Sequence, residues 1–86
     1  MKTEIIKKLR ELIVDARGIP YDRVTLDVEL SDLDVDSLGI IDVMTAIEEE
    51  FGLNDLDEKV YLKFTTVRAL VDYIYESLKN NLPPSN

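Results

Sequence analysis

Apolar residues recur every three or four positions in two long stretches of the chain, which is the spacing of one face of an α-helix. The first stretch covers residues 4–17, where Thr3 is the expected N-cap and Gly18 the residue that ends the helix. The second covers residues 37–51 and ends at Gly52. Both stretches are long enough to be helices rather than strands.

Two further helical segments are expected in the C-terminal part of the chain. Thr66, or Thr65, is the expected cap of a last helix over residues 67–79. Before it, a brief helix can start at the Asp57-Glu58 pair and run through Val60 and Tyr61, or as far as Phe64. The remaining residues, 80–86, contain two consecutive prolines and are expected to form a flexible tail.

The segment between the first two helices, residues 19–35, has a different pattern. Four apolar residues there alternate with polar ones, namely Val24, Leu26, Val28 and Leu30. This alternation is the period of a half-buried strand, but the chain offers no comparable second strand, and a lone strand is not stable. We therefore predict a long loop whose apolar residues pack against the helices, with a single turn at residues 31–34. The expected fold is all-α: a small four-helix bundle with three longer helices, one short helix and a long loop between the first and second helices.

The composition limits the chemistry that this chain can perform. With 86 residues, 45% of them hydrophobic, it is expected to form one domain, residues 1–79, around a single modest core. It has no cysteine and no histidine, which excludes disulfides, thiolate metal sites, a cysteine nucleophile and the usual general base. The start of the chain lacks the apolar segment of a signal peptide, and no apolar run is as long as a membrane span. We therefore expect a cytoplasmic protein.

The net charge of −8 is unevenly distributed. Twelve acidic residues and no basic residue lie between positions 27 and 58, whereas the other six acids share the rest of the chain with all ten Lys and Arg. Such a surface repels nucleic acid and attracts basic protein surfaces. A charge run often serves only solubility, but this one surrounds a single serine, which favours a docking surface. The acids are Asp27, Glu29, Asp32, Asp34, Asp36, Asp42, Glu48, Glu49, Glu50, Asp55, Asp57 and Glu58.

Ser37 starts the second helix, and either Asp36 or Ser37 can cap it, which is the simplest interpretation of the pair. At about 100° per residue, the helix has an apolar stripe for the core and a separate face that includes the serine. The stripe consists of Ile40, Val43, Met44, Ile47 and Phe51. Exposed apolar residues among like charges are typical of a docking surface. On the serine's face lie Leu38, Ile41, Asp42, Thr45, Glu48 and Glu49.

These features resemble the acyl carrier proteins over most of the chain, about residues 5–78. The resemblance rests on Asp36-Ser37-Leu38 at the start of an acidic helix that ends Ala46-Ile47-Glu48-Glu49-Glu50-Phe51, followed by Phe64-Thr65-Thr66-Val67 and Asp72-Tyr73-Ile74. It implies that Ser37 carries a 4′-phosphopantetheine arm, taken from coenzyme A, whose thiol holds acyl groups as thioesters.

The resemblance also implies the partners. They are a phosphopantetheinyl transferase and acyl-loading and acyl-processing enzymes with basic docking patches; no nucleic acid partner is implied, and we expect a monomer. Leu38 and Ile41 would make apolar contacts with these enzymes, and Thr45 lies on the same face. The basic partner residues would meet four acids: Asp36, Asp42, Glu48 and Glu49.

Ser37 is expected to be a passive acceptor, because neither a triad nor a Ser-Lys pair can be assembled around it. The protein is therefore not expected to be an enzyme. The first turn of a helix offers free amides to a phosphodiester. Asp32, Asp34 and Asp36 alternate as in a calcium loop, but the loop's glycine and glutamate positions hold Ser37 and Val43, so no metal site is expected.

The chain departs from the common family pattern at three positions. Asp34 replaces a frequent glycine, which suggests a stiffer and more acidic approach to the serine; Gly39 replaces a frequent acid, and Thr45 a larger apolar residue. These differences favour a specialised, polyketide-like carrier, although fatty-acid synthesis stays open. Two alternatives are an aminoacyl, aryl or peptidyl carrier and an unmodified acidic helical domain that binds a partner directly.

Overall fold

The computed structural model describes residues 2–53 and 56–80. Among these residues it contains four α-helices, two short 3-10 helices and no strand, so the expected all-α fold with one short helix is confirmed. The elements in chain order are α1 (Lys2–Arg17), η1 (Tyr21–Arg23), η2 (Leu30–Leu33), α2 (Ser37–Phe51), α3 (Glu58–Tyr61) and α4 (Val67–Asn80).

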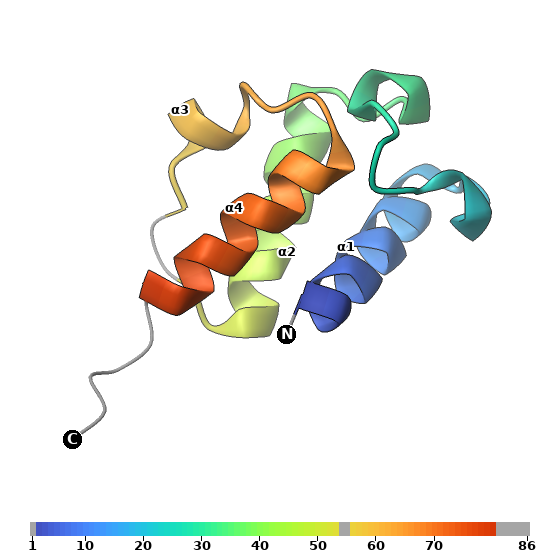
Figure 1. The fold of residues 1–86 in the computed structure, drawn as a ribbon. Helices are drawn as coiled ribbons and strands as arrows, with labels where there is room; N and C mark the ends of the chain where they lie inside the picture. Colours follow the sequence, from blue (N-terminus) through green and yellow to red (C-terminus); the bar gives the residue numbers. More distant parts are fainter. Residues whose placement is uncertain (1, 54–55, 81–86) are drawn as a thin grey trace.

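The three longer helices enclose one apolar core. In Figure 1, α1 runs upward while α2 and α4 run downward, and α1 packs against both of them. Each helix contributes residues spaced three or four apart, as the sequence pattern predicts. The predicted stripe of α2 is confirmed, with Phe51 half-buried at its edge. The buried residues of the three helices are Ile5, Leu9 and Ile13; Ile40, Val43, Met44 and Ile47; and Val67, Leu70, Val71 and Ile74.

The helix ends follow the residues that the sequence predicts, with one exception. Gly18 and Gly52 end α1 and α2 with φ angles of 65° and 67°, a conformation that glycine adopts without strain. Thr66 Oγ1 accepts a hydrogen bond from the amide of Ala69 at 3.2 Å, which identifies Thr66 as the cap of α4.

The exception is the start of α1, which begins at Lys2, so the prediction of Thr3 as the N-cap is wrong. Lys2 Nζ forms an ion pair with Asp72 Oδ1 at 3.1 Å and lies over the ring of Tyr75, so the two additional residues of α1 contact α4. At the other end, α4 continues to Asn80. The rest of the predicted tail, residues 81–86, lies outside the described residues.

The long loop between α1 and α2 pairs with the segment that starts α4. Glu29 forms an antiparallel bridge with Thr66, and the amide of Leu30 donates to the carbonyl of Thr65 at 2.7 Å. Val24 and Leu30 are buried while the intervening apolar residues are half-buried, which explains the alternating pattern without a sheet. The predicted single turn is present as η2, and it delivers the chain directly to the start of α2 (Figure 1).

Aromatic contacts attach the short helix α3 to α4. Asp57 caps α3 by accepting from the amide of Lys59 at 2.9 Å, and the amide of Asp57 itself donates to the Tyr73 hydroxyl at 2.9 Å. The rings of Phe64 and Tyr73 meet edge to face with centroids 5.6 Å apart. Tyr61 is buried beside them, and burial, with the charge of Glu58, raises the pKa of its hydroxyl. These aromatic residues are part of the core and its rim. No described helix has the length and apolar character needed to cross a membrane.

Candidate functional site

Ser37 is the first residue of α2, and its side chain is exposed. The sequence left the cap of this helix open between Asp36 and Ser37, and the structure assigns it to Asp36. Asp36 Oδ1 accepts a hydrogen bond from the amide of Gly39 at 2.8 Å, while the Asp36 backbone is extended. Because the Asp36 carboxylate caps the start of the helix, the Ser37 hydroxyl is not needed as the N-cap and remains free to react.

The approach to Ser37 turns sharply at Asp34. Its φ of 58° and ψ of 31° are left-handed, and it is the one non-glycine residue with positive φ among those described. The turn lets the amides of Asp34 and Val35 donate to the carbonyls of Ser31 and Leu30 at 3.2 and 3.1 Å. Val35 is buried, so this turn is tied to the core. Asp34 thus adopts a conformation that glycine adopts at lower cost, and aspartate is among the side chains that tolerate it best.

Replacing Asp34 with glycine is therefore expected to raise the free energy of unfolding by up to about 1 kcal/mol, because the left-handed conformation no longer strains a Cβ. Asp34→Val should lower it by about 1–2 kcal/mol, since a β-branched residue tolerates positive φ poorly. Urea denaturation of the two variants and the wild type measures both changes. Equal stability of the glycine and valine variants would contradict the strained turn.

The predicted docking face is only partly free of structural contacts. Leu38 is 73% exposed and is the most exposed of the large apolar side chains described. Three other residues of this face are also exposed: Asp42, Thr45 and Glu49. No ion pair to Asp42 or Glu49 occurs within the described part of the chain. Together with Leu38 they form an open surface that begins one residue after Ser37.

Two members of the predicted face take part in the packing of the domain. Ile41 is half-buried and packs against the core, so the expectation that it lies outside the core is wrong in part. Glu48 is half-buried, and its Oε2 accepts a hydrogen bond from the amide of Leu56 at 3.1 Å, which ties α2 to the segment before α3. Helical phase alone cannot reveal these contacts, because they come from neighbouring segments.

Arg17, which the sequence analysis did not select, lies against the start of α2. Its Nη2 donates to Asp36 Oδ1 at 3.1 Å, forming an ion pair between the last residue of α1 and the cap of α2. Both side chains are partly exposed, so the pair is worth between 0 and about 1 kcal/mol. The signal that could have found it is Gly39: a glycine in the first turn of a helix leaves room for a neighbouring side chain.

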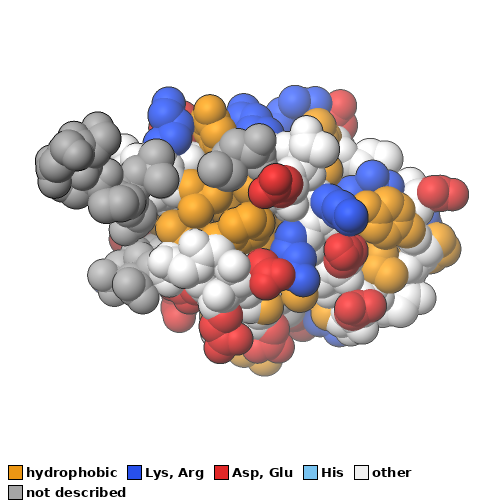
Figure 2. Space-filling view, turned by 90° about the horizontal axis from the view of Figure 1, so that it is seen from below, with side chains coloured by type: hydrophobic (Ala, Val, Ile, Leu, Met, Phe, Trp, Pro, Cys, Tyr) orange, Lys and Arg blue, Asp and Glu red, His pale blue; other side chains and the backbone are white. Residues whose placement is uncertain are grey.

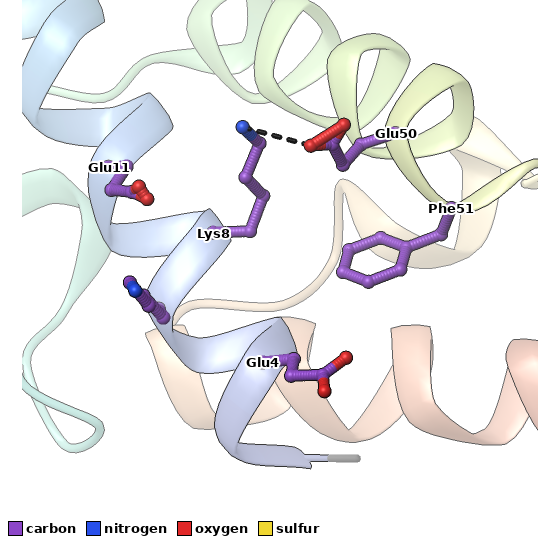
Figure 3. Close-up of a pocket in the computed structure, with 6 residues that line it drawn as sticks. Glu4, Lys8, Glu11, Glu50 and Phe51 are labelled. Atoms are coloured by element: carbon purple, nitrogen blue, oxygen red, sulfur yellow. Dashed lines mark ion pairs between the residues drawn. The ribbon is translucent and has the colours of Figure 1, made fainter.

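The acidic block is partly neutralised by ion pairs along its length. Arg68 pairs with Asp27 at 3.0 Å, which raises the pKa of the guanidinium. Lys8 Nζ pairs with Glu50 Oε1 at 3.0 Å, and this hydrogen bond and charge raise the pKa of the lysine (Figure 3). Nowhere in residues 2–53 and 56–80 do three acidic side chains come close enough to hold a metal ion. Within the described residues, acids without an ion pair therefore lie both on the open surface of α2, at Asp42 and Glu49, and in the loop before it, at Glu29, Asp32 and Asp34.

A groove of about 330 Å³ lies beside Ser37. It is lined by residues from η2, from the first turn of α2 and from the segment before α4, including Leu30, Ile40 and Phe64. Its floor is mainly apolar and its rim carries Glu29 and Asp36. Ser37 itself lines this groove.

A larger groove, of about 510 Å³, is located at the opposite end of α2. Figure 3 shows it between α1 and the end of α2, with Lys8 and Glu50 paired across it and Phe51 and Glu4 at its edge. Acidic and basic side chains are interspersed around apolar ones at this end of the bundle (Figure 2). Because no hydroxyl side chain lines this groove and Lys8 is paired with Glu50 across it, we take the Ser37 end as the candidate site.

Comparisons with known proteins identify similar chains and a similar fold. Residues 7–74 match the family described as "Phosphopantetheine attachment site". The chain is 41% identical over 78 residues to the acyl carrier protein of Petrotoga mobilis, and the aligned region covers 90% of this chain and 91% of the relative. It is 38% identical over 82 residues to the acyl carrier protein of a Picosynechococcus species, and the aligned region covers 94% of this chain and all of the relative. The crystal structure of an acyl carrier protein from Thermotoga maritima is similar, with a TM-score of 0.76, 26% identity and 92% coverage of both chains.

Proposed function

Because this chain belongs to the acyl carrier protein family, whose members carry 4′-phosphopantetheine and are carriers rather than enzymes, we propose that Ser37 is the attachment point of the arm. The observation that carries the proposal is the exposed Ser37 hydroxyl on the first turn of α2, left free by the Asp36 cap. The residues around it fit the group. The first-turn amides favour a phosphodiester, and the adjoining groove can take the flexible arm.

The chemistry at Ser37 needs an external catalyst, because the chain has no histidine and no cysteine to activate the hydroxyl. A phosphopantetheinyl transferase takes the proton from Ser37 Oγ as this oxygen forms its bond to the phosphorus of the pantetheine phosphate. The phosphoanhydride bond of coenzyme A breaks at the same phosphorus, and adenosine 3′,5′-bisphosphate leaves. The arm supplies a thiol that this cysteine-free chain lacks, on which acyl groups are held as thioesters. The chain itself contributes the hydroxyl, the helix terminus and the surface that the transferase recognises.

The surface that partners recognise is proposed to be the face of α2 that follows Ser37. Exposed Leu38 supplies the apolar anchor, and Asp36, Asp42 and Glu49 supply charge for basic patches. Ile41, Thr45 and Glu48 lie on the same face, where Ile41 and Glu48 also support the fold. Clustered charge around a small apolar anchor accelerates encounter and fixes the orientation of the partner.

Association with the transferase is expected to slow roughly tenfold as salt rises from about 20 mM to about 500 mM, because exposed charges are screened. Glu49→Lys should slow it at low salt, since this exposed acid has no ion pair within the described residues. Asp22→Lys, which makes the same charge change on η1 outside the acidic block, is the control and should leave the rate nearly unchanged. Stopped-flow or surface-binding kinetics measure the rates. Rates that are indifferent to salt would show that docking is purely apolar.

The cargo is proposed to be an acyl group of fatty-acid or specialised, polyketide-like synthesis. Three observations support it: the relatives are acyl carrier proteins, the surface is acidic, and no Gly-Gly pair precedes the serine. We propose further that residues 1–79 form the carrier domain and that it works as a monomer in the cytoplasm. An aminoacyl, aryl or peptidyl cargo is the alternative, which acyl- and aminoacyl-loading assays on the modified protein distinguish.

Intact mass measurement after incubation with coenzyme A and a transferase tests the carrier function. The expected result is the addition of one phosphopantetheine to each chain. An unmodified interaction domain would show no addition with any of several transferases, and that outcome would overturn the proposal. Two or more additions would contradict a single attachment site.

A further inference from the structure

Arg17 occupies the space that Gly39 leaves open on the first turn of α2. A Cβ built on Gly39 would lie 2.9 Å from Arg17 Nη2, closer than real Cβ contacts occur, and 3.3 Å from Asp36 Oδ1. Gly39 is buried although it is in the first turn of a surface helix. The guanidinium, the Asp36 carboxylate and Gly39 therefore form one packed unit, and the absence of a side chain at Gly39 is what permits it.

The position of Arg17 relative to the docking face follows from helix geometry. Residues three apart are neighbours on a helix, so Gly39 borders Asp42, and the face that starts at Leu38 runs along Asp42 and Thr45. Arg17, lying over Gly39, is thus at the α1 edge of that face and next to Asp36. It is partly exposed, with 34% of its side chain accessible, so an approaching partner meets its positive charge.

We propose that Arg17 is a selectivity residue for partners of the Ser37 site. The inference rests on the proposed carrier function and adds to it the kind of partner that fits. Arg17 offsets the charge of Asp36 at the serine end of the face, while Asp42 and Glu49 stay unpaired within the described residues. The matching partner surface is basic opposite Asp42 and Glu49 and neutral or acidic opposite Arg17. A patch that is basic throughout is disfavoured, because like charges then face each other.

The chain supplies a matched control for this proposal. Lys2 also belongs to α1 and also pairs with an acid of another helix, Asp72 of α4, at 3.1 Å and with a partly exposed side chain. It lies fifteen residues before Arg17, about 22 Å along the helix. That separation exceeds a Debye length of about 8 Å at physiological salt, so the charge of Lys2 is largely screened from a partner at Ser37. Lys2→Gln therefore removes the same charge and a comparable ion pair without changing the surface of α2.

The test uses a broad-specificity phosphopantetheinyl transferase whose docking patch is uniformly basic, with coenzyme A, and measures kcat and KM for modification of the whole chain. Arg17→Gln is expected to raise kcat/KM about two- to fivefold, mainly through a lower KM, because one repulsive charge is removed and Asp36 is released. Lys2→Gln should change it by less than about 1.5-fold. The difference between the two variants should disappear at about 0.5 M salt, which a merely structural role for Arg17 would not produce.

Gly39→Ala is a second variant that keeps the charge but displaces the guanidinium. The far end of a flexible side chain moves easily, and alanine favours the helix, so the variant should fold. It should raise kcat/KM in the same direction as Arg17→Gln and by a smaller factor. Equal effects of Arg17→Gln and Lys2→Gln, or a fall in kcat/KM for Arg17→Gln, would overturn the inference while leaving Ser37 as the attachment site. Failure of the wild type to be modified at Ser37 would instead overturn the proposed function, and the inference with it.

Discussion

Replacing Ser37 with alanine is expected to abolish attachment of phosphopantetheine and leave the domain folded. The hydroxyl is the group that forms the bond to phosphorus, so its loss removes the reaction rather than slowing it. The fold should persist because Ser37 is exposed and Asp36 supplies the cap, so the free energy of unfolding should change by less than about 0.5 kcal/mol. Intact mass and circular dichroism of the variant measure the two effects.

Ser31→Ala provides the matched control for that experiment. Ser31 is exposed and lines the same groove beside Ser37. A catalyst that modified any accessible serine in this groove would therefore modify Ser31 as well as Ser37. The control should be modified to the same extent as the wild type. Modification of the Ser37→Ala variant, or loss of modification in Ser31→Ala alone, would refute the assignment of the attachment point.

Truncating Ile47 should have a large effect on the stability of the domain. Its side chain is fully buried at 0% exposure, so Ile47→Ala is expected to lower the free energy of unfolding by about 2–5 kcal/mol through lost transfer energy and the cavity left behind. Leu38→Ala, on the same helix, should change it by less than about 0.5 kcal/mol, because Leu38 is 73% exposed. Urea denaturation gives both values.

For modification by the transferase the order should be the opposite: Leu38→Ala should have the larger effect and Ile47→Ala the smaller. Leu38→Ala is expected to lower kcat/KM for modification at least about fivefold, as loss of an apolar interface anchor does. A folded Ile47→Ala variant keeps its surface and should be modified at nearly the normal rate. Ile41→Ala should fall between the two, since Ile41 is half-buried against the core and also borders the docking face. If Leu38→Ala unfolded the domain while Ile47→Ala did not, the assignment of the two faces would be wrong.

The sequence predicts the helices of this fold well because their apolar residues keep one period and their ends carry strong signals. Gly18, Gly52 and Thr66 end or start helices where the pattern indicates. The start of α1 is mispredicted because Lys2 is held by Asp72, a contact between residues seventy positions apart. Propensity at a helix end is a weak preference, and a tertiary contact readily overrides it.

The loop before α2 shows where periodicity is ambiguous. Its alternating residues fit a strand, yet the partner of Glu29 is a single position before α4, and one bridge is not a sheet. The sequence correctly excludes a strand by the absence of a second one. It does not predict the left-handed turn at Asp34, since aspartate adopts that conformation only when hydrogen bonds such as that from Asp34 to Ser31 support it.

Part of the candidate site can likewise be predicted from the local sequence, and part depends on contacts between distant segments. Ser37, Asp36 and Leu38 are identified from adjacent positions and helical phase, and the structure places all three at the exposed start of α2. The contact of Arg17 with Asp36 depends on how α1 crosses α2, which no local pattern specifies. Distant contacts thus determine which acids of the docking face remain uncompensated.

The most direct test of the central claim is to locate the arm on the modified chain. Cleavage after Arg23 and Lys59 releases residues 24–59 as one peptide, since no basic residue lies between them, and this peptide contains both Ser31 and Ser37. Fragmentation in a tandem mass spectrometer then assigns the added mass to one residue. The account predicts the phosphopantetheine mass on Ser37 alone; finding it on Ser31, on a threonine or on another peptide would contradict the account.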